Sequence, residues 1–178
     1  RIRMTVRMAF ANAKGWMLLN TSNKTEFYIG YSTLYGDLSG VFGPIGGLFK
    51  HQVYGLALWR NKMSQTLRTF DSSSTCNNTK MSQTSVRFDS FPIPENSLQK
   101  APSAELADGQ TDQDSLGLDY DTLDKMLLVY ERAEQAGKNL AEIKSEIKDA
   151  GFSEEKIDRI LGLIEANKFK QPLTPPHP

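Results

Sequence analysis

The chain has 178 residues, and its 21 Lys and Arg are balanced by 21 Asp and Glu, so the overall charge points to neither nucleic acid nor a membrane surface as partner. A single cysteine, Cys76, excludes an intrachain disulfide, and no run approaches the roughly 18 apolar residues of a membrane helix. With one cysteine and two histidines there is no ligand set for zinc. We expect a cytoplasmic protein that binds neither nucleic acid nor membrane.

The charge is unevenly distributed along the chain. Residues 1–62 carry eight Lys or Arg against two acids, Glu26 and Asp37, whereas the remainder carries 13 against 19. A basic half suits an anionic ligand. Equally, the two halves could simply pack against each other, and charge alone leaves both explanations open.

The first 30 residues predict a helix, a strand and a second helix. A helix over 1–13, which Gly15 would end, is indicated by an apolar stripe at helical spacing: Ile2, Val6, Ala9, Phe10 and Ala13. Residues 16–19 form a continuous apolar run of the kind found in buried parallel strands, and a polar turn precedes a short helix at 24–30. This order predicts an α/β fold, in which ligands bind beyond the carboxyl end of a strand.

Residues 36–90 divide into a loop, a helix and an insertion. Glycines indicate a loop over 36–47, and a helix is expected from Leu48 to Asn61 with Val53, Leu56 and Ala57 inward. Residues 62–90 contain a duplication, KMSQTLRTFDS and KMSQTSVRFDS, and are rich in Ser, Thr and Asn. Because this composition buries little apolar surface, we expect an exposed, flexible insertion.

The rest of the chain predicts a loop over 91–118 and then three helices. The first spans about 120–136, the second begins after Asn139 and ends at Gly151, and the third begins after Ser153 and runs to about Asn167. Their expected inward residues are Leu123, Met126, Leu127 and Tyr130 in the first helix and Leu140, Ile143 and Ile147 in the second. The proline-rich tail PLTPPHP is expected to be irregular.

Four residues in the basic half have the chemistry to bind a nucleotide. A hydroxyl (Thr21), two carboxylates (Glu26 and Asp37) and a lysine that opens a helix (Lys50) could together hold a phosphate and its Mg²⁺. As a spacing pattern this is weak, since any two acids can be ordinary surface residues. A run of aspartates also resembles a metal cluster, although we expect Asp119 and Asp121 to cap the following helix; the run comprises Asp112, Asp114, Asp119, Asp121 and Asp124.

Several longer motifs resemble one family. The stretches NTSNKTEFYIGYSTLYGDLSG, PIGGLFKHQVYGLALWRN, IPENSLQKAPSAEL and QTDQDSLGLDYDTLD are similar, in this order, to the carboxy-terminal part of the NAD synthetase domain, most closely in the glutamine-dependent branch. The resemblance covers residues 1–61 and 91–176.

The resemblance implies a partial parallel sheet of the adenine-nucleotide hydrolase-like type with a helical carboxy-terminal region. Residues 1–61 would belong to the α/β core, 62–90 to the insertion, and 91–178 to a substrate-closing loop and the helical region. Family members use ATP and Mg²⁺ to adenylate the nicotinate carboxylate of deamido-NAD, and ammonia then displaces AMP. In the glutamine-dependent branch an upstream glutaminase domain supplies the ammonia. Homo-oligomers, commonly dimers, are implied.

The resemblance also assigns roles to individual residues. Thr21, Lys50 and Ser103 would contact ATP; Arg1, Glu26 and Lys170 would contact deamido-NAD; and Glu26 would be the residue that holds Mg²⁺. Each has an ordinary alternative: Lys50 can be a solvated lysine at a helix start, Ser103 a turn residue, and Arg1 a terminal residue. Asp37 can serve only to shape the glycine loop.

The sequence departs from the family pattern in three places. The ATP loop Ser-Gly-Gly-x-Asp-Ser does not occur in these 178 residues, Gln171 and Pro172 replace an arginine pair, and Gly47 replaces an acidic residue. We therefore expect a fragment that is inactive alone. The rival interpretation is a non-catalytic remnant whose helices over 120–167 act as an interaction module.

Overall fold

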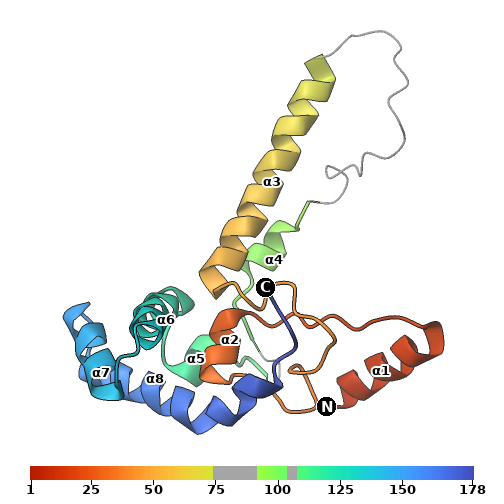
Figure 1. The fold of residues 1–178 in the computed structure, drawn as a ribbon. Helices are drawn as coiled ribbons and strands as arrows, with labels where there is room; N and C mark the ends of the chain where they lie inside the picture. Colours follow the sequence, from red (N-terminus) through yellow and green to blue (C-terminus); the bar gives the residue numbers. More distant parts are fainter. Residues whose placement is uncertain (74–91, 104–107) are drawn as a thin grey trace. The chain divides into compact units, whose positions relative to one another are not determined.

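The computed structural model describes residues 1–73, 92–103 and 108–178, and within 64–73 it describes the backbone alone. The chain divides into two compact units, Arg1–Val53 with Asp112–Pro178, and Tyr54–Thr111. Figure 1 shows the elements in chain order: α1 (Ile2–Lys14), α2 (Lys24–Ile29), α3 (Lys50–Ser73), α4 (Glu95–Gln99), α5 (Asp112–Leu116), α6 (Tyr120–Gln135), α7 (Leu140–Asp149), α8 (Glu154–Asn167) and a 3₁₀ helix, η1 (Lys168–Leu173). Within the described ranges, no helix combines the length and apolarity needed to cross a bilayer.

The expected α/β fold with a partial parallel sheet is wrong for the described part of the chain, which is helical and contains no strand. The apolar run at 16–19 forms a single parallel bridge, Leu19 with Phe42. Its Trp16 and Met17 side chains are 67% and 76% exposed. Parallel strands are normally buried on both faces of a sheet, whereas this run is largely exposed. In the part of the chain that the structure describes, its strand-like backbone contacts are those around the bridge: the Val41 N–H donates to the Leu18 carbonyl, and the N–H of the following Asn20 donates to the Phe42 carbonyl, both at 2.9 Å.

The first helix forms where the sequence predicts it, but it buries other residues. Helix α1 ends at Gly15, whose left-handed φ of 64° suits a residue without a Cβ atom. The expected apolar stripe lies outward, with Ile2, Val6 and Phe10 exposed, while Met4 and Ala11 are buried. The periodicity located the helix, but it did not identify the face that packs.

Helix α3 is longer than predicted. It begins at Lys50 and continues past Asn61 to Ser73, because residues 62–73 contain no Gly or Pro and several good helix formers. The inward assignment of Leu56 is wrong, since this side chain is 49% exposed. The remainder of the expected insertion, residues 74–90, lies outside the described residues.

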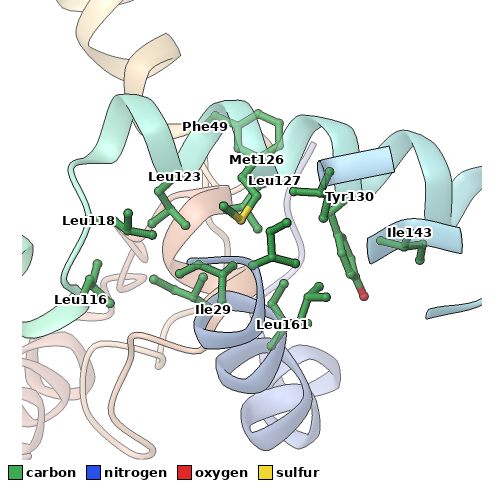
Figure 2. Packing of buried hydrophobic residues seen from close by; sticks show 14 of the residues in the cluster. Ile29, Phe49, Leu116, Leu118, Leu123, Met126, Leu127, Tyr130, Ile143 and Leu161 are labelled. Atoms are coloured by element: carbon green, nitrogen blue, oxygen red, sulfur yellow. The ribbon is translucent and has the colours of Figure 1, made fainter. Parts of the chain in front are cut away.

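The core of the first unit forms around α6, as the sequence predicts. Leu123, Met126 and Leu127 are completely buried, and Tyr130 nearly so. Figure 2 shows these side chains facing Ile29 of α2 and Leu161 of α8. The three carboxy-terminal helices therefore share one core with α2.

The ends of α7 and α8 lie close to their predicted positions. Asn139 forms a capping box with Glu142, whereas Ser153 begins α8 without a side-chain hydrogen bond. Ile143 and Ile147 are buried as expected, but Leu140 is exposed. The expected loop over 91–118 contains two short helices, α4 and α5, and the tail begins as the 3₁₀ helix η1.

Candidate functional site

The site begins at the amino terminus of α2, where local sequence fixes a carboxylate. The Asn23 side chain accepts a hydrogen bond from the Glu26 N–H at 3.1 Å, and Glu26 Oε2 accepts one from the Asn23 N–H at 3.2 Å. This is a capping box, with Asn as the N-cap and Glu three residues later. It holds the Glu26 side chain in one orientation at the helix start.

The second oxygen of Glu26 meets the lysine that opens α3. Lys50 Nζ lies 2.9 Å from Glu26 Oε1, and both side chains are 17% exposed. Lys50 Nζ also lies 4.9 Å from the centre of the Tyr120 ring, within cation–π range. Two residues that the family resemblance singled out, 24 positions apart in sequence, are thus adjacent in the structure.

Tyr120 connects this pair to a buried aspartate. Its hydroxyl donates to Asp112 Oδ2 at 2.8 Å, and Asp112 Oδ1 is buried without a hydrogen-bond partner. Burial raises the pKa of Tyr120, and the hydrogen bond to Asp112 and the charge of Glu26 raise it further. Tyr120 therefore remains a neutral donor. Sequence reasoning missed Tyr120 and read Asp112 only as part of an acidic run.

The two cations expected to bind deamido-NAD both donate to the segment 30–34. Arg1 Nε lies 3.1 Å from the Leu34 carbonyl oxygen. Lys170 Nζ lies 2.8 Å from the Gly30 carbonyl oxygen and 2.9 Å from that of Ser32. The structure therefore brings Arg1 and Lys170 to one short segment, where each is engaged with backbone carbonyls.

The remaining predicted contacts lie elsewhere. Thr21 is exposed on the loop before Asn23. Ser103 belongs to the second unit, where its hydroxyl donates to the Gln110 carbonyl at 2.5 Å. Asp37 accepts a hydrogen bond from the Thr33 N–H at 2.5 Å, which favours the interpretation that it shapes the loop.

The acidic run does not form a metal cluster. Asp119 caps α6 as predicted, accepting from the Thr122 N–H at 2.9 Å, while Asp121 pairs with Lys125 instead of capping. Among the described residues, no group of three or more His, Cys, Asp or Glu side chains is placed to hold a metal ion. A Mg²⁺ ion that arrives with substrate phosphates takes only one or two protein carboxylates, so a single carboxylate such as that of Glu26 could serve it.

A cavity of about 370 Å³ is lined by residues of α2, α6, the glycine loop and the tail. The predicted site residues are not among those that line it. Its lining is Lys24, Phe27, Tyr28, Gly46, Glu131, Glu134, Gln171, Thr174 and His177. In this wall Lys24 pairs with Glu131, and the Phe27 and His177 rings lie 5.4 Å apart.

Comparisons with known proteins agree on one family. The family model described as NAD synthase matches residues 1–174. The chain is 35% identical, over its whole length, to a glutamine-dependent NAD(+) synthetase from Xylella fastidiosa, of which it covers 27%. It is 34% identical over 98% of its length to an NH(3)-dependent NAD(+) synthetase from Methanocaldococcus jannaschii, of which it covers 53%.

Solved structures of similar fold carry related names. A structure described as NMN synthetase from Francisella tularensis matches 96% of this chain and 50% of its own, with a TM-score of 0.60 and 25% identity. A glutamine-dependent NAD(+) synthetase from Cytophaga hutchinsonii shares the fold, with a TM-score of 0.57 over 98% of this chain and 23% of its own. The chain thus spans about a quarter to a half of the proteins that it matches.

Proposed function

Because this chain belongs to the NAD synthase family, we propose that it forms the carboxy-terminal part of a synthetase that converts deamido-NAD to NAD. A carboxylate resists attack by ammonia, so the nicotinate carboxylate would first react with ATP to give a mixed anhydride and pyrophosphate. Ammonia would then attack the acyl carbon, and AMP would leave as the amide forms. ATP with its Mg²⁺, ammonia and deamido-NAD are the proposed substrates, and glutamine is the proposed source of ammonia in the glutamine-dependent branch.

The observation that carries this proposal is the Glu26–Lys50 pair within the family-matched region. Phosphate charge crowds together as the anhydride forms, and a preorganised lysine stabilises that charge in the transition state. Lys50 is held in place by Glu26 and the Tyr120 ring, so little reorganisation is needed. We propose that Lys50 neutralises an ATP phosphate and that Glu26 meets the Mg²⁺ that accompanies it.

The other predicted residues fit this scheme as proposals. Arg1 and Lys170 would exchange their backbone carbonyl partners for charged groups of deamido-NAD. Thr21, on its exposed loop, and Ser103 would hydrogen-bond to ATP. A cytoplasmic, homo-oligomeric enzyme remains our expectation.

A second candidate substrate follows from one structural relative. The similar structure from Francisella tularensis is described as an NMN synthetase. Amidation of the corresponding nicotinate mononucleotide would need the same chemistry at the carboxylate. We place it second, because the relatives that are 33–36% identical carry NAD(+) synthetase names.

The rival interpretation, a helical interaction module over 120–167, finds less support. The apolar faces of α6, α7 and α8 are buried against one another and against Ile29 of α2. An interaction module would need such a face to be available for a partner.

The test is an amidation assay on the complete synthetase that carries this chain, with ATP, Mg²⁺ and ammonia. We expect deamido-NAD to be preferred over nicotinate mononucleotide. Lys50→Gln and Glu26→Gln should each lower kcat/KM about 100-fold or more, as expected for lost charge stabilisation. Lys125→Gln, which removes an exposed lysine of α6, is the control. Unchanged turnover in both site variants would contradict the proposal.

A further inference from the structure

Asp124 is a fully buried carboxylate. One of its oxygens contacts α2, which carries Glu26, and the other contacts the start of α3, which carries Lys50. Its Oδ1 accepts a hydrogen bond from the Thr25 hydroxyl of α2 at 2.5 Å. Its Oδ2 accepts one from the His51 N–H of α3 at 2.7 Å and lies 2.9 Å from His51 Nδ1. A buried carboxylate is tolerated only when it is paired in this way.

The contact with the His51 N–H makes Asp124 a cap for α3 that comes from another helix. The first N–H groups of a helix lack partners within that helix, and a carboxylate at this end also interacts favourably with the helix dipole. Asp124 therefore fixes where α3 begins relative to α6, and Lys50 is the first residue of α3.

Thr25 extends the connection to Lys50 itself. The Thr25 hydroxyl donates to Asp124 and accepts a hydrogen bond from the Lys50 N–H at 2.9 Å, and its side chain is fully buried. Thr25 directly precedes Glu26, and Lys50 directly precedes His51. Asp124 thus contacts Thr25, the neighbour of Glu26, and His51, the neighbour of Lys50.

We propose that Asp124 is a positioning residue for the reaction, which sets the Glu26–Lys50 geometry through Thr25 and the start of α3. This inference rests on the proposed function of the pair. Because Asp124 is fully buried and contacts Thr25 and His51, it would act on the reaction through the neighbouring Glu26 and Lys50. A purely structural aspartate would affect folding stability in the same way but would have no specific link to Lys50.

A double-mutant cycle in the complete synthetase separates these roles. We expect Asp124→Asn, which replaces one acceptor oxygen by an NH₂ group, to lower kcat/KM for ATP about 10-fold or more. In a Lys50→Gln background the same substitution should change kcat/KM less than about 3-fold. Asp121→Asn, an exposed aspartate of the same helix, should have no effect. An equal loss in both backgrounds would overturn the proposal.

A second pair of variants covers the case in which Asp124→Asn does not fold. Thr25→Ser keeps the hydroxyl and should retain activity within about 3-fold, whereas Thr25→Val keeps the shape and should lose about 10-fold. Equal activity of the two would overturn the proposal.

A direct readout is available in the 178-residue chain. The Lys50 ammonium should give a slowly exchanging NMR signal that Thr25→Val weakens and Thr25→Ser preserves. An unchanged signal in Thr25→Val would count against positioning.

The outcomes also distinguish this inference from the function on which it rests. If Lys50→Gln leaves kcat/KM unchanged, the proposed function fails, and the inference fails with it. If Lys50→Gln lowers kcat/KM about 100-fold as proposed while the Asp124→Asn loss is equal in both backgrounds, only the inference fails.

Discussion

Glu26 uses both carboxylate oxygens, one on Lys50 Nζ at 2.9 Å and the other on the Asn23 N–H at 3.2 Å. The same side chain therefore caps α2 and pairs with the lysine at the start of α3. These two roles can be separated by substitution, because glutamine also completes a capping box but carries no charge.

We expect Glu26→Gln to lower the free energy of unfolding of the chain by less than about 1 kcal/mol, since only the partly exposed ion pair is lost. Glu26→Ala should cost about 1 kcal/mol more, because the helix start loses a hydrogen bond as well. Urea unfolding of both variants measures the difference. Equal destabilisation would show that the capping box contributes nothing.

The core around α6 predicts a contrast between two leucines. Leu127 is fully buried, so Leu127→Ala should destabilise the chain by about 2–5 kcal/mol through lost burial and the cavity left behind. Leu140 is an exposed leucine at the start of α7, so Leu140→Ala should lower the free energy of unfolding by less than about 0.5 kcal/mol. Thermal and urea unfolding test this, and a similar cost at both positions would contradict the packing described for α6.

Alanine substitution at two glycines should change the free energy of unfolding in opposite directions. A Cβ atom at Gly46 would lie 2.7 Å from His177 Cβ and 2.9 Å from the Phe27 ring, so Gly46→Ala should displace the tail and cost about 1–3 kcal/mol. Gly162 lies within α8 and faces open space, so Gly162→Ala should stabilise by about 0.5–1 kcal/mol. Loss of the NMR contact between Phe27 and His177 in Gly46→Ala alone would confirm the displacement, and its persistence would refute it.

Asp119 should give the chain a specific sensitivity to acid. Hydrogen bonds from the Thr122 N–H and hydroxyl hold the pKa of Asp119 below its usual value. A carboxyl whose pKa is lower in the folded state contributes stability above its unfolded pKa of about 3.9, and this is lost as pH falls through the folded value. Asp119→Asn should flatten the stability profile below about pH 4. An unchanged profile would show that the cap does not depend on charge.

The 178-residue chain alone should make no NAD. In the family pattern a Ser-Gly-Gly-x-Asp-Ser loop holds the pyrophosphate, and this loop does not occur in the 178-residue sequence, so the proposed Lys50 contact with phosphate would lack it. Incubation with deamido-NAD, ATP, Mg²⁺ and ammonia tests this. Steady turnover of about 1 per second or faster, typical of enzymes, would refute it.

The sequence by itself determined the features that depend on neighbouring residues. The ends of α1, α2, α6 and α7 follow from caps such as Gly15 and Asn139, whose hydrogen bonds span only a few residues. The periodicity of α6 also identified its buried face, because apolar residues recur there at helical spacing. The family resemblance picked out Glu26 and Lys50 through motifs whose order is visible without a structure.

Only the tertiary structure decided which of these pieces meet. The run at 16–19 has the composition of a buried strand, yet whether it becomes one depends on pairing partners that its own residues cannot specify, and here it finds a single bridge. For the same reason the sequence could not reveal the role of Asp124, which is one aspartate in an acidic run. Its role comes from Thr25 and His51, 99 and 73 positions away, and such contacts form only when the helices pack.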